Sequence, residues 1–178
     1  MDDVNVNDIV EADDAVTWYK SKINDLSNKK IEFKKESFPQ IGKMYLFTYD
    51  AKHKDKLPFF DVFPLVFPIE FYSDGFLGLN LHYLPIFARA GLLDSLSKLA
   101  TDDKYTDNTK LNISYGVLKS AANSFGDYNS CIKRYLFGHI RSSFSYISPN
   151  DWSKAVALPI HRWKLNPDLK YRTSAPPY

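Results

Sequence analysis

The sequence predicts an α+β fold in which a small antiparallel β-sheet, either curled or closed into an SH3-like barrel, is flanked by helices. Residues 42–85 are rich in aromatic side chains and alternate with a period of two between turn signals, which is typical of short strands. The segments before and after them carry apolar residues three or four positions apart, which is typical of helices. With 178 residues, of which 44% are apolar and 16% aromatic, the chain can build the core of one domain.

The expected organisation is an acidic N-terminal arm (1–14), a single domain (15–163) and an extended C-terminal tail (164–178). Within the domain, the β core covers about 42–85 and the helical part about 86–158. The arm carries six acidic side chains and no basic one, and the tail lacks apolar periodicity. We therefore expect the tail to be disordered or laid along a partner.

The first helix is expected over 15–27. Asp13 or Asp14 is a suitable N-cap, and the apolar residues that follow are spaced by three and four. These residues are Val16, Tyr19, Ile23 and Leu26. A lysine-rich linker over 28–40 separates this helix from the strands.

The first strand is expected over 44–49, where both alternating faces are largely apolar. Such a strand is buried on both sides or lies at a barrel seam. A polar loop or hairpin (DAKHKDK, 50–56) follows it.

A hairpin is expected over 63–81, with its turn at the SDG sequence of residues 73–75. Two prolines, at positions 64 and 68, cannot donate backbone hydrogen bonds, so the first strand of the hairpin must be an edge or contain a bulge. Gly78 in the second strand permits a close backbone approach. The short connections favour antiparallel pairing.

The second half of the chain is expected to be mainly helical, with helices over 86–100 and 149–158 and a charged loop over 101–110. Residues 111–124 begin with the alternation of a short strand, but a helix fits them equally well. A further helix is expected from Asp127, on the basis of a broad apolar stripe. The stripe consists of Tyr128, Ile132, Tyr135, Leu136, His139 and Ile140.

Composition excludes several classes of protein. The single cysteine, Cys131, excludes an internal disulfide framework or a cysteine-based zinc site, and we expect it to be a buried apolar residue of a protein in a reducing compartment. The densest apolar run, 59–72, is interrupted by acidic residues and prolines and is too short to span a bilayer, so no membrane partner is expected. The acidic start lacks a signal-peptide pattern, which favours synthesis in the cytoplasm.

No pattern in the sequence supports catalysis, and we expect no catalytic residue, metal, cofactor or small-molecule substrate. Walker A, GxGxxG, GxSxG and HExxH patterns are absent, and the histidines lack metal-binding spacing, so His82 is interpreted as structural. Asp50, Asp61 and Asp74 would form an acidic site if they met at one end of the sheet, but turn capping explains them more simply. Glu32 begins an EFK sequence that occurs in nuclease motifs, but it lies in the lysine-rich linker.

Charge gives the clearest candidates for binding. Residues 131–178 carry eight basic and two acidic side chains, which indicates either a solvated face or contact with nucleic acid or an acidic partner. The candidate binding residues are Lys133, Arg134, Arg141, Arg162, Lys164, Lys170 and Arg172. The aromatic residues of 45–72 could stack on bases, but a chain with this many phenylalanines needs most of them in its core.

Several strings carry a resemblance to a known family. These are GKMYLFTYD, KDKLPFFDVFPLVFPIEFYSDGFLGLNLHYLP, YGVLKSA and CIKRYLFGHIRSSF with a following DW helix, and the resemblance as a whole covers about 15–163. They resemble virion proteins of T-even-like contractile-tailed phages, in the DNA end protector family. The resemblance implies a structural protein of the virion, made in the bacterial host's cytoplasm and placed with the end of the packaged genome near the head-to-tail junction. It implies other virion proteins and the DNA terminus as partners, and no catalytic residue.

Two alternatives remain open at this stage. One is a baseplate or tail assembly protein that never contacts DNA, and the other is a nuclease that acts on DNA ends. Salt-dependent DNA binding separates the first alternative from end protection, and metal-dependent cleavage would identify the second.

Overall fold

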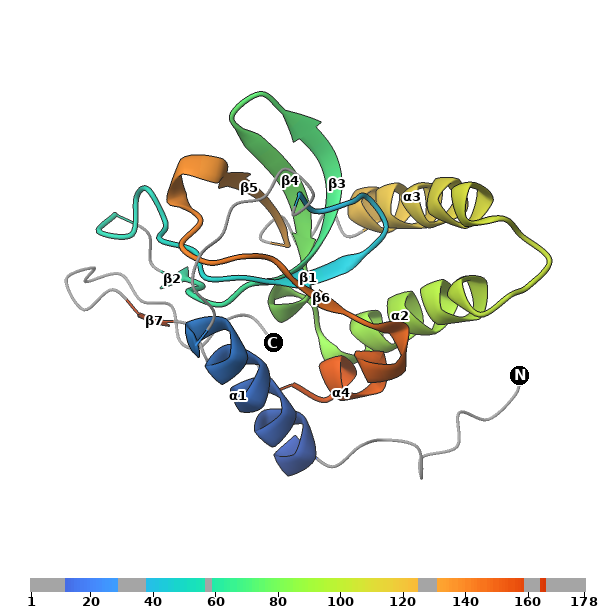
Figure 1. The fold of residues 1–178 in the computed structure, drawn as a ribbon, viewed down its shortest axis with the longest axis horizontal. Helices are drawn as coiled ribbons and strands as arrows, with labels where there is room; N and C mark the ends of the chain where they lie inside the picture. Colours follow the sequence, from blue (N-terminus) through green and yellow to red (C-terminus); the bar gives the residue numbers. More distant parts are fainter. Residues whose placement is uncertain (1–11, 29–37, 57–58, 125–130, 159–163, 166–178) are drawn as a thin grey trace.

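The computed structural model describes residues 12–28, 38–56, 59–124, 131–158 and 164–165, and it has an α+β fold (Figure 1). The helices are α1 (Ala12–Asn28), α2 (Ile86–Ala100), α3 (Asp107–Ser124) and α4 (Trp152–Val156), with single 3₁₀ turns η3 (Leu81–Tyr83), η5 (Phe137–His139) and η6 (Pro149–Asp151). The strands are β1 (Met44–Leu46), β2 (Phe59–Phe60), β3 (Leu65–Tyr72), β4 (Gly75–Asn80), β5 (Ile132–Leu136), β6 (Ser145–Ile147) and β7 (Lys164–Leu165).

Five strands form one antiparallel sheet in the order β5-β4-β3-β1-β6. The α+β class is thus confirmed, but the predicted SH3-like barrel is wrong, because β5 and β6 are the two edges of an open sheet. β2 and β7 pair separately as a two-stranded ribbon.

Both faces of this sheet are buried, which explains why β1 is apolar on both sides. Met44 and Leu46 pack into the core cluster that includes residues of all four helices, whereas Tyr45 and Phe47 pack into a second, mainly aromatic cluster on the other face. All four side chains are at most 8% exposed. The strand is shorter than the predicted 44–49, but the prediction that it is buried on both sides is confirmed.

The second face is covered by the chain that runs from β5 to β6. Asp50 donates its backbone N–H to His139 O (2.9 Å), and Arg141 N–H donates to Thr48 O (2.8 Å). Tyr49 also forms an isolated bridge with Ile140. This connection shields the aromatic cluster from water, so the apolar face is buried without closure of a barrel.

The predicted β3–β4 hairpin is confirmed, with its turn at residues 73–74. β3 lies in the middle of the sheet, and its register shifts between Pro68 and Glu70. Of the two ways to accommodate proline, the protein thus uses a bulge and not an edge. A Cβ atom on Gly78 would lie 2.2 Å from Val66 Cγ1, which confirms the close approach expected at this glycine.

The prediction of a helix from Asp127 is wrong for the described residues, which begin at Cys131. Residues Ile132–Leu136 form β5, and Phe137–His139 form η5. Tyr135 is buried in the aromatic cluster and pairs with Phe76 of β4, so burial against the sheet outweighs the helical spacing of the sequence. The region predicted to be helical therefore supplies both edge strands.

The remaining helices agree more closely with the sequence. The helix expected over 86–100 is confirmed as α2, and the ambiguous segment 111–124 lies in the helix α3. α1 starts at Ala12, ahead of the two proposed N-caps. The helix expected over 149–158 is η6 followed by α4, and Ser148 Oγ accepts a hydrogen bond from Asn150 N–H, as a capping residue does. Among the described helices, none has both the length and the hydropathy of a membrane span.

Candidate nucleic-acid interface

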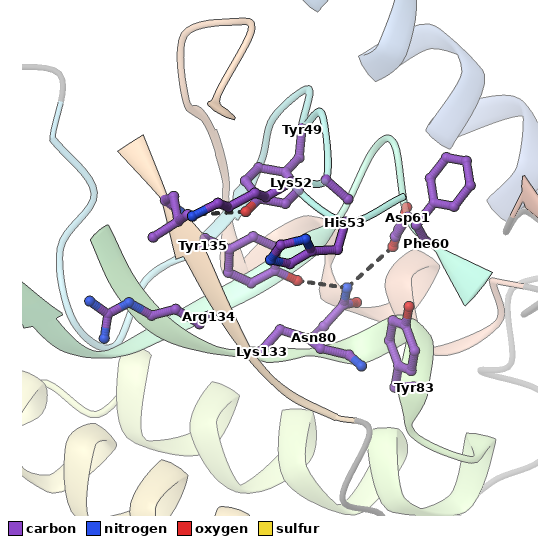
Figure 2. A pocket seen from close by; sticks show the side chains of 12 residues that line it. Tyr49, Lys52, His53, Phe60, Asp61, Asn80, Tyr83, Lys133, Arg134 and Tyr135 are labelled. Carbon is purple, nitrogen blue, oxygen red and sulfur yellow. Dashed lines mark hydrogen bonds between the residues drawn. The ribbon is translucent and has the colours of Figure 1, made fainter. Parts of the chain in front are cut away.

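A pocket of about 350 Å³ lies beside the β4–β5 edge of the sheet (Figure 2). The loop after β1, the end of β4, the 3₁₀ turn η3 and strand β5 all contribute side chains to it. Its aromatic lining residues are Tyr49, Phe60, Tyr83 and Tyr135, its basic or imidazole residues are Lys52, His53, Lys133 and Arg134, and its other polar residues are Asp61 and Asn80.

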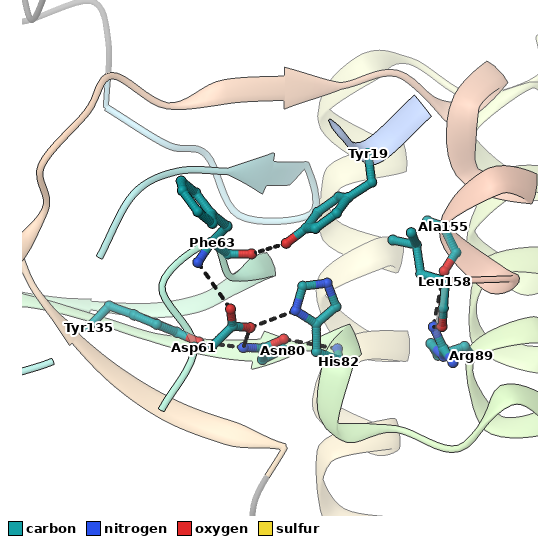
Figure 3. Close-up of polar contacts among 9 residues, drawn as sticks. All are labelled: Tyr19, Asp61, Phe63, Asn80, His82, Arg89, Tyr135, Ala155 and Leu158. Carbon is teal, nitrogen blue, oxygen red and sulfur yellow. Dashed lines mark hydrogen bonds and ion pairs between the residues drawn. The ribbon is translucent and has the colours of Figure 1, made fainter. Parts of the chain in front are cut away.

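A buried hydrogen-bond network (Figure 3) includes three residues that line the pocket, Asp61, Asn80 and Tyr135. Asn80 Nδ2 donates to Asp61 Oδ2 (3.2 Å) and to the hydroxyl of Tyr135 (2.9 Å). Asp61 Oδ2 also lies 2.6 Å from His82 Nδ1, and Asp61 Oδ1 accepts the N–H of Phe63 at 3.0 Å. Because Asn80 and His82 are at most 4% exposed, these bonds hold the pocket wall rigid.

The same network accounts for the burial of His82, interpreted from the sequence as a structural residue. Its backbone N–H donates to Asn80 Oδ1 (2.9 Å), its ring meets the Asp61 carboxylate, and it packs edge-on against Tyr19. Tyr19 in turn donates its hydroxyl proton to Phe63 O, which ties α1 to the loop that carries Asp61. His82 is therefore satisfied by the fold.

Lys133 projects from β5 over an aromatic ring of the pocket. Its Nζ lies 4.4 Å from the ring centre of Tyr83, the geometry of a cation–π contact. Burial lowers the pKa of Lys133, because desolvation disfavours the ammonium form. Burial also raises the pKa of Tyr83, and the negative charge of Asp61 adds to this effect. A bound anion would therefore stabilise the charged form of Lys133 more than it would stabilise that of an exposed lysine, because water solvates the Lys133 ammonium group less.

Arg134 and Arg141 are each held by an acidic side chain. Arg134 stacks on Tyr72, with its guanidinium carbon 3.8 Å from the ring centre, and forms an ion pair with Asp74. Arg141 reaches Asp50 Oδ2 at 3.5 Å and donates to Gly138 O. Both arginines are partly exposed, so they can exchange these partners for phosphate oxygens.

Of the seven predicted binding residues, the structure brings two, Lys133 and Arg134, to the pocket. Arg141 lies beside it, bonded to the loop that supplies Lys52 and His53. Lys164 is in β7, where its backbone pairs with Phe60, another pocket residue. The remaining three, Arg162, Lys170 and Arg172, lie outside the described residues.

The three aspartates do not form a joint acidic site. Asp50 bonds Lys54 and Arg141, Asp61 lies in the buried network, and Asp74 pairs with Arg134. The hydrogen bond from Lys54 lowers the pKa of Asp50. In the part of the chain that the structure describes, no three His, Cys, Asp or Glu side chains gather as metal ligands do. Glu32, of the nuclease-like sequence, is outside that part.

Sequence reasoning missed Lys52, His53 and Tyr83 as candidates. The KHK sequence of the polar loop lies close to the pair Phe59 and Phe60. Basic residues close to aromatic ones are typical of nucleic-acid interfaces, so this pattern could have indicated the loop as part of a binding site. That β5 would lie opposite this loop did not follow from the sequence once β5 was interpreted as a helix.

The pocket combines cationic groups with aromatic side chains, which is the chemistry of a binding site for anions that carry planar rings. In agreement with this chemistry, residues 3–173 match the family described as Phage T4 terminal DNA protecting protein. The chain therefore belongs to this family of phage proteins. Comparison with curated proteins and with solved structures yields no match.

Proposed function

We propose that this protein binds the end of the phage genome and shields it as a structural component of the virion. The observation that carries the proposal is the family match over 3–173, whose description names the protection of terminal DNA. The pocket supports it, because Lys133 and Arg134 lie among aromatic side chains, a combination typical of nucleic-acid interfaces.

Protection by this chain is a matter of binding and not of chemistry. A bound protein denies a nuclease access to the terminal phosphodiester bonds, and this requires no catalytic group. The protein would act in the particle, at the portal, neck or tail where the genome end lies, after synthesis in the bacterial host. Other virion proteins would be its neighbours there.

The test is digestion of linear duplex DNA by a purified exonuclease with and without the full-length protein. The expected result is slower digestion of linear DNA in proportion to occupancy, with no effect on endonuclease nicking of closed circular DNA. Unchanged exonuclease digestion at saturating protein would contradict the proposal.

The same assay distinguishes the alternatives. A baseplate or tail assembly protein would neither bind nor protect DNA at about 0.15 M salt, and charge-removing substitutions would only block its incorporation into particles. A nuclease would cleave linear DNA when magnesium or manganese is added without exonuclease. We expect no such cleavage, and a cleavage lost in Glu32→Gln or Asp50→Asn would show that the protein is an enzyme.

A further inference from the structure

We propose that the pocket binds the unpaired terminal nucleotide of a DNA strand. The inference rests on the proposed function and specifies how the DNA end is recognised. The pocket volume of about 350 Å³ is at the lower end of the range of about 300–1,000 Å³ for small-molecule sites, so it suits one nucleotide and cannot admit a duplex.

The walls of the pocket suit a base. Tyr49, Phe60, Tyr83 and Tyr135 reach the pocket from four separate parts of the chain. The three tyrosines are at most 8% exposed, whereas Phe60 is partly exposed, so Phe60 is the ring best placed to stack on a base. Aromatic side chains stack on any base, because every base has a π-face, so such a pocket binds without regard to sequence. A protein that guards the end of a genome requires this tolerance.

The charges of the pocket suit the phosphates on either side of that base. Lys52, Lys133 and Arg134 line it, and Lys133 is already held against the ring of Tyr83. Among the described lining residues, the one carboxylate, Asp61, is engaged by His82, Asn80 and the Phe63 N–H. The available charge of the pocket is therefore positive.

The shape of the pocket explains why an end is preferred to the interior of a duplex. An internal base must lose its pairing and two stacking contacts before it can leave the helix, whereas a terminal or already unpaired base loses fewer contacts. The affinity is therefore expected to rise from closed circular DNA to blunt ends and again to short single-stranded overhangs.

The structure offers matched controls at the other edge of the sheet. Lys43 Nζ lies 5.7 Å from the ring centre of Tyr146 on β6, so a second lysine–tyrosine pair exists outside the pocket. Lys43→Met removes the same chemical group as Lys133→Met, and Tyr146→Leu removes an exposed aromatic ring as the control for Phe60→Leu. Lys52→Ala is a further pocket variant, and since Lys52 is exposed this change leaves folding intact.

The experiment uses the full-length protein and duplexes with a short overhang of either polarity that carries 2-aminopurine at its last position or at an internal paired position. We expect the fluorescence of the terminal probe to fall on binding and that of the internal probe to stay constant. Phe60→Leu should weaken overhang binding about tenfold, and Lys52→Ala and Lys133→Met should each lower the salt slope by about 0.7. The two control variants should bind as the wild type does, with melting temperatures checked throughout.

The outcomes separate the two proposals. If the protein prefers linear to closed circular DNA but neither quenches the terminal probe nor responds to Lys52→Ala, the pocket inference is wrong and end binding uses another surface. If the protein shows no preference for linear DNA, the proposed function fails, and the pocket inference fails with it.

Discussion

Single residues in this protein join segments that are far apart in the sequence. Asn80 bonds Asp61, 19 positions before it, and Tyr135, 55 positions after it. No local sequence pattern predicts such a network, because whole helices and strands separate its members along the chain. The candidate site could be predicted only in part for this reason: the basic residues of β5 were recognised by their charge, whereas the polar wall of the pocket was not recognised.

Gly78 is a residue whose role follows from the sequence and can be tested. Gly78→Ala should destabilise the fold by about 1–3 kcal/mol, because the new methyl group collides with Val66 Cγ1. Urea unfolding measures the change. In the double variant Gly78→Ala/Val66→Ala the loss should be less than the sum of the two single losses, since the second change removes the colliding atom.

A matched control for this prediction is Gly91→Ala in α2. A Cβ atom there meets nothing within 4 Å, so the change should be neutral or stabilise the helix by up to about 1 kcal/mol. Equal effects at the two glycines would contradict the close-approach interpretation of Gly78.

The buried tyrosine Tyr135 should make stability depend on alkaline pH. Burial, with the charge of Asp61, raises the pKa of Tyr135 well above 10.0, so the folded state holds the phenol proton more tightly than the unfolded chain does. The resulting stability is complete below about pH 10 and is lost as the pH rises toward the folded-state pKa.

Tyr135→Phe should therefore flatten the fall of unfolding free energy above about pH 10 by up to about 1.4 kcal/mol per pH unit. Burial lowers the pKa values of Lys133 and Arg89, which act in the opposite direction but are present in both proteins. Urea unfolding across the pH range measures the difference, with the exposed Tyr105→Phe as control. Parallel curves for wild type and Tyr135→Phe would contradict the prediction.

At the scale of elements, the sequence was informative wherever local signals and tertiary packing agreed. The turn at 73–74, the bulged β3 and the helix α2 follow from turn residues, prolines and a helical stripe. β5 did not follow, because its residues repeat at helical spacing and only their burial against β4 decides the strand. The open sheet could not be predicted either. It depends on the β5–β6 connection, which passes over the aromatic face and places β5 and β6 at opposite edges, and no local pattern in the sequence specifies that path.

Helix α4 depends on a side chain from another helix. Arg89 of α2 is 1% exposed and donates to Ala155 O (3.2 Å) and Leu158 O (2.8 Å), at the C-terminal end of α4. Burial lowers the pKa of Arg89 to about 10. Since α4 has only five residues, these two bonds supply carbonyl partners that the helix cannot supply itself.

Arg89→Met should destabilise the protein by about 1.5–3 kcal/mol, because two buried carbonyl groups lose a charged donor. Amide exchange should also accelerate in α4 more than in α2. Lys98→Met, on the same helix but 75% exposed at its side chain, should change stability by less than about 0.5 kcal/mol. A wild-type stability for Arg89→Met would show that burial of the guanidinium costs as much as its bonds contribute.

In the whole molecule, both faces of the sheet are buried in core clusters, and one edge of the sheet is accessible at the pocket. The helices cover one face and the β5–β6 connection covers the other, so the β4–β5 edge and the loop after β1 are left to frame the pocket. The basic groups gathered there are partly neutralised by Asp50 and Asp74. Under the proposed function, we expect the strength of DNA binding to depend on the balance between these acids and the arginines that they hold.

This balance gives a prediction with opposite signs for the two members of one ion pair. Arg134→Met should weaken binding to linear DNA and lower the log–log salt slope by about 0.9, the value for one duplex phosphate contact. Asp74→Asn should strengthen binding, because it removes a competing carboxylate while Arg134 remains stacked on Tyr72. Fluorescence anisotropy with a labelled duplex across a salt series measures both effects. A pair with only a structural role would instead give weaker binding in both variants, in step with lower melting temperatures, and that result would remove Arg134 from the interface.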